Sequence, residues 1–336
     1  TMAEFDMCPD CRREYENPLD RRFHAQPVAC PVCGPQIWFE APDYPKVTGE
    51  DALQTARRWL KEGKILAIKG LGGFHLACDA TNVKAVDMLR SRKQRVDKPF
   101  ALMAYDLKTV RQYCFVNDQE AELLLSRQRP IVLLEHRASS NAAPAVAPNQ
   151  LTMGVMLPYT PLHLLLLEPE EGYPDFLVMT SGNLSEEPIC YEDEDALVRL
   201  APMADGFLLH NRRIHMRVDD SVYREMAGQP YPIRRARGFA PDGILLPSPI
   251  LPILAGGAEL KNTFCLTRNN YAFLSHHIGD LENYETFRSY EDGIRHYEQL
   301  FRFKPYLFPR DLHPNYLSTR YIHQRAREEN IPVVTV

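Results

Sequence analysis

The sequence contains no hydrophobic run long enough to cross a membrane. Its most apolar stretch, GVMLPYTPLHLLLL at residues 154–167, is interrupted by Pro158, Pro161 and His163. A spanning helix needs about 20 predominantly apolar residues. A basic leader followed by an apolar segment is also missing from the first residues. We therefore expect a cytoplasmic protein that makes no membrane contact.

An excess of positive charge is missing as well. The 39 Lys and Arg residues are outnumbered by 44 Asp and Glu residues, so the formal net charge is -5 at pH 7. A negatively charged protein has no overall attraction to nucleic acid or anionic lipid. Nucleic acid is therefore not the expected partner, and each local basic cluster has to be considered separately.

Two proline-rich seams divide the 336 residues into three regions. The seams are APDYPKV at 41–47 and APDGILLPSPILPI at 240–253, where prolines interrupt any periodic pattern. A chain of this length with 45% hydrophobic residues can form two or three cores. The predicted regions are 1–42, 46–240 and 248–336.

The hydrophobic patterns predict an α/β fold. In the second region an amphipathic helix with Ala52, Ala56 and Leu60 on its apolar face ends at Gly63, and short apolar runs such as IVLLEH and FLVMTSG alternate with further helical segments. This alternation indicates a mixed α/β sheet domain. The third region has strand candidates at 250–257, 262–268 and 271–277, then two helices that are each followed by a strand. We predict a βββαβαβ order there.

Cys8, Cys11, Cys30 and Cys33 form two Cys-x-x-Cys pairs near the start of the sequence. In a large cytosolic protein such pairs indicate metal binding rather than disulfides, and four thiolates suit tetrahedral Zn²⁺. The alternative is four unrelated thiols. A zinc with four protein ligands has no open position for a substrate. We predict a structural zinc that replaces the hydrophobic core which about 35 residues cannot build.

Several polar segments of the second region have side chains suited to phosphate. The run LRSRKQRVDKPFALM supplies Lys93 and Arg95, and VMTSGNLSEEPI delivers Ser181 and Asn183 after a strand. The segments HNRRIHMRVDDSVYR and IRRARGFAP gather arginines around a pair of aspartates; these residues are Arg212, Arg213, Arg217, Arg234, Arg235, Arg237, Asp219 and Asp220. Arginines bind phosphates with two donors, and carboxylates hold Mg²⁺. The alternatives are a solvated helix end, an ordinary turn and surface salt bridges.

Taken together and in this order, these segments resemble the YrdC-like domain of the hydrogenase-maturation carbamoyltransferases, the HypF family. KGLGGFHLACDATN is similar to the opening strand and loop of that domain, and RKQRVDKPFALM to its Lys-x-Arg stretch. The front segment CPDCRREYENPLDRRFHAQPVACPVCGP resembles the second of the two zinc motifs of the family. GGAELKNTFCL and SHHIGDLENYET resemble the start of its actin-like or ribonuclease-H-like carbamoyl-transfer domain.

The resemblance implies a carbamoyltransferase that uses ATP and Mg²⁺. In this family, carbamate released from carbamoyl phosphate is joined to ATP as carbamoyl adenylate, and the carbamoyl group passes to the C-terminal cysteine of a hydrogenase-maturation partner protein. Matching of motifs assigns the nucleotide phosphates and carbamoyl oxygens to Lys69, Lys93 and Arg95, the adenylate to Ser181 and Asn183, the rest of the polyphosphate grip to Ser221, Arg234 and Arg237, and Mg²⁺ to Asp219 and Asp220.

Two parts of the family are missing from the match: the acylphosphatase domain with the first zinc motif, and the remainder of the transfer domain with its histidine-rich metal site. We therefore expect an internal fragment that can form carbamoyl adenylate but cannot complete the transfer. Two other functions stay open. One is threonylcarbamoyl-adenylate synthesis. The opening motif of the related synthases resembles Thr-x-Tyr-Gly-Leu, and the loss of both hydroxyls at Gly72 and Phe74 here disfavours that function. The other is a zinc-containing RNA-binding module that uses the arginines of the front segment.

Overall fold

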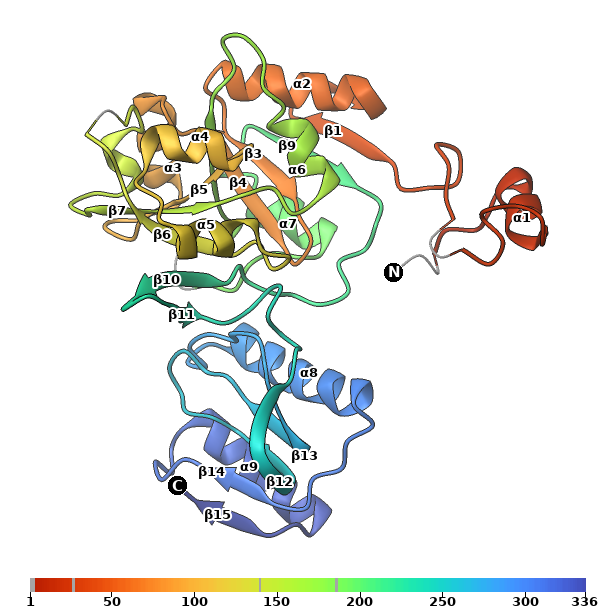
Figure 1. Ribbon diagram of the computed structural model, residues 1–336, viewed down its shortest axis with the longest axis vertical. Helices are drawn as coiled ribbons and strands as arrows, with labels where there is room; N and C mark the ends of the chain where they lie inside the picture. The colour runs from red at the N-terminus through yellow and green to blue at the C-terminus, as the bar shows by residue number, and fades with distance from the viewer. Residues whose placement is uncertain (1–3, 26–27, 139, 185–186) are drawn as a thin grey trace.

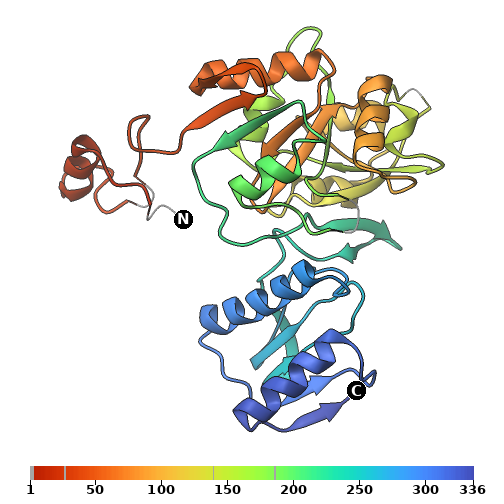
Figure 2. The same ribbon diagram turned by 180° about the vertical axis from the view of Figure 1, so that it is seen from behind.

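The computed structural model describes residues 4–25, 28–138, 140–184 and 187–336. Along the chain they form a small N-terminal segment around α1 (Pro9–Glu16), a central sheet domain and a last domain (Figure 1). Seen from behind, α1 stands apart from the sheet, and the last domain lies beyond the sheet edge (Figure 2). None of the helices in these residues is long and apolar enough to span a membrane.

The central domain is built on one mixed sheet whose strands follow the order β11-β10-β6-β7-β5-β8-β4-β3-β9-β1-β2. The pairs β3–β9, β5–β7 and β6–β10 are parallel, and the other pairs are antiparallel. The strands are β1 (Ile37–Ala41), β2 (Tyr44–Thr48), β3 (Leu66–Lys69), β4 (Phe74–Asp79), β5 (Ala101–Ala104), β6 (Ile131–Glu135), β7 (Thr152–Met156), β8 (Phe176–Ser181), β9 (Gly206–His210), β10 (Val222–Met226) and β11 (Gln229–Arg234).

Helices cover both faces of this sheet, and each face has its own hydrophobic core. One core joins the strands to α3 (Val83–Arg92), α4 (Leu107–Tyr113), α5 (Asp118–Leu125), α7 (Asp193–Arg199) and the short 3₁₀ helix Pro144–Val146. The other core joins them to α2 (Gly49–Lys61) and α6 (Pro161–Leu166). The predicted amphipathic helix is confirmed as α2, since Ala52, Ala56 and Leu60 are fully buried. The mixed α/β architecture is confirmed with it.

The first strand of the sheet comes from inside the predicted zinc-binding region 1–42. Residues Ile37–Ala41 form β1, which pairs antiparallel with β9 of the central domain. Phe39, at the middle of β1, lies opposite Leu208. The segment that holds the cysteines is therefore joined to the sheet by a strand that is itself part of the sheet.

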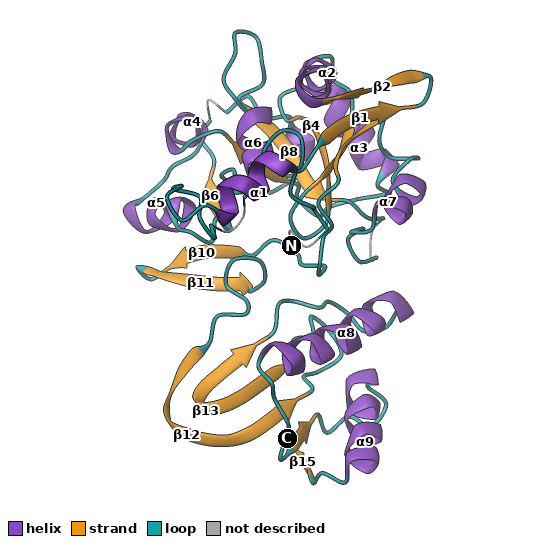
Figure 3. Ribbon diagram, turned by 90° about the vertical axis from the view of Figure 1, so that its right-hand side faces the viewer, coloured by secondary structure: helices purple, strands orange, loops and turns teal. Residues whose placement is uncertain are grey.

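The last domain has the order ββαβαβ in residues 244–336, all of which are described. Its elements are β12 (Ile244–Ala255), β13 (Cys265–Leu274), α8 (Tyr284–Leu300), β14 (Phe308–Arg310), α9 (Leu317–Glu329) and β15 (Val333–Thr335). Both helices lie on one side of the curved β12–β13 ribbon (Figure 3). Tyr290 and Phe264 are fully buried between these elements, and the Tyr290 hydroxyl donates to the Gly256 carbonyl at 2.9 Å.

The predicted βββαβαβ order is wrong in one strand. The candidates at 262–268 and 271–277 form a single strand, β13, which runs through Asn269 and Asn270 between them. Asn269 does adopt a positive φ of 56°, which asparagine tolerates well. It nevertheless keeps its pairing with Ile250, and the irregularity is absorbed as register shifts in β12.

Candidate functional site

The four cysteines of the front segment converge as a zinc site requires. Their sulfurs all lie within 4.8 Å of one another. The Cys8 and Cys30 sulfurs are 3.7 Å apart, and those of Cys30 and Cys33 are 3.8 Å apart. Zn–S bonds of about 2.3 Å at tetrahedral angles place sulfurs about 3.8 Å apart, so the group fits Zn²⁺.

Local backbone structure prepares these thiols for metal. Cys8 caps α1, which places Cys11 on its first turn. The Val32 N–H donates to the Cys30 sulfur at 3.3 Å, and backbone N–H groups lower the pKa of Cys33 to about 6. Gly34 is required because a Cβ there would lie 2.7 Å from the Cys30 carbonyl oxygen. Metal binds thiolates, so a lowered thiol pKa favours it.

The arginines of the front segment are partly neutralised by nearby acids. Arg13 pairs with Asp10 at 2.8 Å and Arg22 with Glu14 at 2.5 Å. Each pairing places a negative charge beside an arginine, and this charge would compete with an RNA phosphate. The RNA-binding alternative is therefore weakened in this segment.

Lys93 lies at the centre of the second candidate site. It is the C-cap of α3 and is only 1% exposed. Its ammonium donates to the Ser181 carbonyl at 2.7 Å, the Asn183 carbonyl at 2.5 Å and the Asn183 Oδ1 at 2.6 Å. Burial, together with the neighbouring Arg95 charge, lowers the pKa of Lys93 to about 7. The predicted Lys-x-Arg stretch and the Ser-Gly-Asn turn therefore meet in the fold.

Arg95 joins the same place from the loop that follows α3. Its Nη1 donates to Thr180 Oγ1 at 3.1 Å, and its Nη2 donates to the Pro99 carbonyl at 2.6 Å. Burial and the charges of Arg90 and Arg234 lower the pKa of Arg95 to about 10. An anion bound near Arg95 would oppose this effect, because it would stabilise the charged guanidinium.

The Ser-Gly-Asn turn itself is fixed by close backbone packing. The Ser181 hydroxyl donates to Asn183 Oδ1 at 2.8 Å, and the Gly182 N–H donates to the Phe74 carbonyl at 2.7 Å. A Cβ on Gly182 would lie 2.8 Å from that carbonyl oxygen. Only glycine therefore lets the turn approach β4 this closely.

Lys69 lies at the end of β3 and already has a protein counter-ion. Its ammonium is 2.7 Å from Asp193 Oδ1 and donates to the His210 carbonyl at 2.9 Å. The side chain is 2% exposed. Its predicted role as a phosphate ligand stays a prediction, and the observed contacts give it the role of anchoring α7 to the sheet.

The Asp-Asp-Ser and Arg-x-x-Arg motifs also meet, with unequal roles. Asp220 accepts from Arg237 Nε at 2.7 Å and lies 3.0 Å from His75 Nε2. The fully buried Ser221 hydroxyl accepts from the Ala236 N–H at 2.8 Å and donates to the Arg237 carbonyl at 3.0 Å. Asp220, Ser221 and Arg237 therefore hold the loop together from inside.

Asp219 and Arg234 differ from these buried neighbours. The Asp219 carboxylate is 3.9 Å from Arg234 Nη1, and both side chains are about 30% exposed. Asp219 lies within reach of the Lys93 charge, because it opposes the lowering of the Lys93 pKa. Asp219 rather than Asp220 therefore has a partly exposed carboxylate that a cation could reach.

Sequence reasoning missed the buried network beneath this loop. His75 connects Asp220 to the Tyr159 hydroxyl, which lies 3.4 Å from its Nε2, and the His163 ring is centred 6.0 Å from the His75 ring. Burial would raise the pKa of Asp220, but Arg237 and His75 more than offset it and the pKa is lowered. The only signal in the sequence was a single histidine in an otherwise apolar strand.

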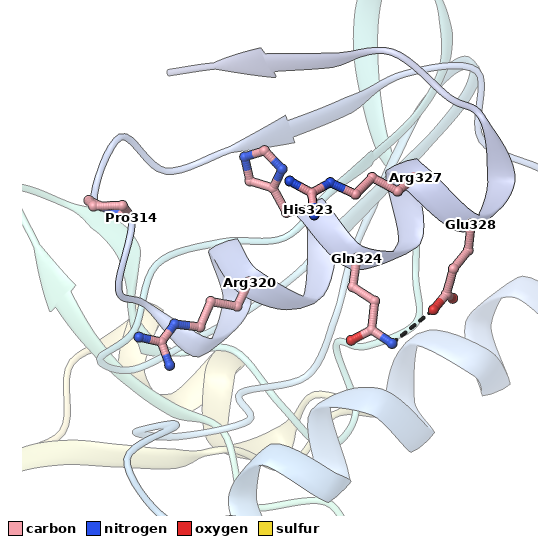
Figure 4. A pocket seen from close by; sticks show the side chains of 6 residues that line it. All are labelled: Pro314, Arg320, His323, Gln324, Arg327 and Glu328. Carbon is pink, nitrogen blue, oxygen red and sulfur yellow. Dashed lines mark hydrogen bonds between the residues drawn. The ribbon is translucent and has the colours of Figure 1, made fainter.

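A shallow hollow on the last domain lies apart from these residues. It measures about 660 Å³ and follows α9, as Figure 4 shows. Its lining residues are Pro314, Arg320, His323, Gln324, Arg327 and Glu328, and Gln324 donates to Glu328 at 2.8 Å. None of the predicted site residues lines it.

The fold and the two sites together define a class of multidomain protein. A Cys₄ zinc finger is joined to an α/β domain in which cations converge on a strand-end turn, and a further α/β lobe follows. Three family models match in the same order: the HypF finger over residues 7–40, the Sua5/YciO/YrdC family described as telomere recombination over 58–236, and the HypF Kae1-like domain over 249–336.

Carbamoyltransferase HypF of Rhodobacter capsulatus is 45% identical over 339 residues, which cover 100% of this chain and 44% of the relative. A crystal structure of full-length HypF in a phosphate- and nucleotide-bound form matches with a TM-score of 0.89 and 49% identity, over 99% of this chain and 43% of that one. A threonylcarbamoyl-AMP synthase of Vibrio vulnificus is 32% identical over 145 residues, or 41% of this chain and 75% of the relative.

The chain belongs to the HypF carbamoyltransferase family. It spans less than half the length of the HypF relative and of the solved HypF structure described above.

Proposed function

We propose that the central domain forms carbamoyl adenylate from ATP and carbamate. The observation that carries this proposal is the contact of Lys93 and Arg95 with the strand end and turn at Thr180–Asn183, where Lys93 binds Ser181 and Asn183 and Arg95 binds Thr180. A nucleotide- and phosphate-bound HypF structure of the same fold supports a polyphosphate ligand. The name carbamoyltransferase, shared by the HypF relatives, supports the carbamoyl group.

The reaction needs charge stabilisation more than proton transfer. A carbamate oxygen attacks the α-phosphorus of ATP, the new P–O bond forms, and the bond to the β-phosphate oxygen breaks to release pyrophosphate. Carbamate is already an anion, so no general base is required. Two anions must approach each other, and positioned cations lower the barrier.

The contacts give each residue a role in this reaction. Lys93 fixes the Ser181–Asn183 turn through three oxygens and supplies positive charge beside it. Arg95 and Arg234 would bind the phosphates, and Ser181 with Asn183 would orient the adenylate. Mg²⁺ would be held by Asp219 and the phosphates, because Asp220 is already bound by Arg237 and His75.

The carbamoyl group would then pass to a C-terminal cysteine of a hydrogenase-maturation partner, for use in the cyanide ligands of [NiFe] hydrogenase. Carbamoyl phosphate would be the source of the carbamate. The Cys₄ site would hold a structural Zn²⁺ throughout, since its four sulfurs leave no open ligand position.

Threonylcarbamoyl-adenylate synthesis is the competing function. It would need room for a threonine-derived substrate and hydroxyl groups to bind it. Here a Cβ on Gly72 would lie 2.3 Å from Val218 Cγ1, so this position has no space for a hydroxyl-bearing side chain. Phe74 is fully buried in the core. Both observations favour carbamate.

The test is ATP–pyrophosphate exchange with the zinc-loaded chain. Carbamate generated from ammonium bicarbonate is compared with threonine plus bicarbonate. We expect exchange that depends on carbamate. Lys93→Met and Arg95→Ala should each reduce it by about 10-fold to 100-fold, because each removes a charge-assisted contact worth about 1.5–3 kcal/mol.

Arg92→Ala is the matched control. Arg92 precedes Lys93 but pairs with Asp205 at 2.8 Å and the Met203 carbonyl at 3.2 Å, away from the turn. Its removal should leave exchange within about two-fold of the parent. Exchange that requires threonine would favour the competing function, and equal losses in all three variants would refute the assigned site.

A further inference from the structure

The segment Arg234–Arg237 connects the candidate nucleotide site to the last domain. Its three arginines contact different parts of the protein. Arg237 is bound within the central domain by Asp220 and by the carbonyls of Gln128 and Arg129 at 3.0 Å and 2.8 Å. Arg234 lies 3.9 Å from Asp219, and its charge contributes to the lowered pKa of Arg95. This leaves Arg235 for a separate role.

Arg235 is bound to the last domain by both its side chain and its backbone. Its Nη1 donates to the Leu274 carbonyl at 2.8 Å, and its own carbonyl accepts from the His277 N–H at 2.9 Å. Its Nη2 donates to the carbonyls of Phe239 and Asp242, each at 2.7 Å. The guanidinium thus joins the end of β13 to the chain that leaves the central domain.

The sequence order makes Arg234 and Arg235 mechanically dependent. Strand β11 ends at Arg234, and successive side chains of an extended backbone point to opposite sides. Arg234 therefore projects toward Asp219 while Arg235 projects toward Leu274. The Ala236 N–H bond to Ser221 Oγ and the Arg237 N–H bond to the Asp219 carbonyl at 3.0 Å restrict sliding of this segment. A shift of one arginine must move the other.

Electrostatic interactions near this contact also extend from one domain to the other. Asp219 acts on the pKa values of His276 and His277, which follow β13, and Arg234 acts on that of His277. Arg235 acts on the pKa of Tyr297 in α8 and on that of Tyr223 in β10. The contact between the domains is therefore close in space as well as along the chain.

We propose that Arg235 is a positioning residue that couples anion binding at the Lys93–Arg95–Arg234 site to the ordering of the last domain. The proposal rests on the proposed function for its natural ligand, ATP. A bound polyphosphate holds Arg234, and the fixed register of 234–237 holds Arg235 against Leu274 and His277. By linkage, contact with the last domain strengthens nucleotide binding by the same factor.

The experiment is hydrogen exchange of the zinc-loaded chain with and without ligand. Inorganic triphosphate and Mg-ATP are both used, because triphosphate occupies a cationic site whether or not adenylate chemistry follows. In the parent, either ligand should slow exchange at the 274–277 amides by about five-fold or more. Arg235→Ala should abolish this slowing while the ligand still protects the 181–183 amides. Arg235→Lys, which keeps the charge but not the forked donor, should restore only part of it.

Arg127→Ala is the matched control. Arg127, which follows α5, forms an exposed ion pair at 2.8 Å with Asp242 of the connecting chain. Within the described residues this pair joins Arg127 to the connection and not to the last domain. Its removal should leave the response of the 274–277 amides intact. The proposal is overturned if Arg235→Ala responds like Arg127→Ala, or if neither ligand slows 274–277 in the parent. If triphosphate slows exchange at the 274–277 amides and Mg-ATP does not, the proposed function is refuted and the coupling is upheld.

Discussion

The protonation of Lys93 provides a direct test of the proposed nucleotide site. Burial lowers its pKa to about 7, and a polyphosphate beside it would stabilise the protonated form. With that pKa, about 24% of the empty sites carry the protonated lysine at pH 7.5 and about 1% at pH 9. Nucleotide that requires the charge should therefore bind about 25-fold more weakly at pH 9.

The direction of this pH dependence follows from the protonation of Lys93 in the empty and the nucleotide-bound site. The site loses its proton as pH rises through the pKa of the empty form, so binding above that pH includes the cost of proton uptake. Below about pH 7 the γ-phosphate of ATP also titrates, so the range from about pH 7.5 to 9 isolates Lys93. Histidines near the site stay neutral there, because burial lowers the pKa values of His276 and His277 to about 4.

Isothermal titration with Mg-ATP at three pH values measures this effect. Performing it in buffers with different ionisation enthalpies also counts the protons taken up, and the count should approach one per site at pH 9. Lys93→Arg keeps its charge across the range and should bind ATP with little pH dependence. Parent affinity that stays constant from pH 7.5 to 9 would refute the reasoning, and would show that the carbonyls of Ser181 and Asn183 keep Lys93 protonated.

Three further predictions follow from the geometry. Chelation of zinc should release one metal ion per chain and increase proteolysis between residues 8 and 33, because the four sulfurs are the only metal cluster found among the described residues. The temperature of the thermal transition of the central domain should not change. Asp220→Asn should lower the free energy of unfolding by about 3–5 kcal/mol, since it leaves the buried Arg237 without its counter-ion; a denaturant midpoint equal to that of the parent would contradict this. Gly182→Ala should cost about 1–3 kcal/mol and reduce pyrophosphate exchange, because its Cβ would meet the Phe74 carbonyl, and an unchanged denaturation curve would show that the turn can move aside.

Features encoded by short-range spacing were predictable from the sequence. The two Cys-x-x-Cys pairs identified the cysteine cluster, which the structure confirms with sulfurs within 4.8 Å. The apolar period of residues 52–60 identified α2. Both predictions depend on residues a few positions apart, and at that spacing the covalent geometry of the chain restricts the possible local structures. The strand order of the last domain was predicted wrongly because pairing of Asn269 with Ile250 in β12 continues one strand through the gap between the two candidates, and this pairing is not visible in local spacing.

Features that depend on distant partners could not be predicted from spacing. His75 and Asp220 are 145 positions apart, and Lys93 and Ser181 are 88 apart. The sequence marked each segment as suited to phosphate but could not show which cations have protein counter-ions. Arg237 and Arg234 looked equivalent in IRRARGFAP, yet one is buried in an ion pair and the other is about a third exposed.

The distribution of counter-ions explains where an anion can bind. Lys69 is neutralised by Asp193 at 2.7 Å and Arg237 by Asp220 at 2.7 Å, so neither adds much net charge to the site. Among the described residues, Asp219 is a carboxylate near Arg234, at 3.9 Å, and its charge also acts on Lys93. Burial and, after it, repulsion from neighbouring cations lower the pKa values of Lys93 and Arg95. A polyphosphate would relieve that repulsion with little rearrangement, and this preorganised field is the form of electrostatic stabilisation that attack on a phosphoryl group requires.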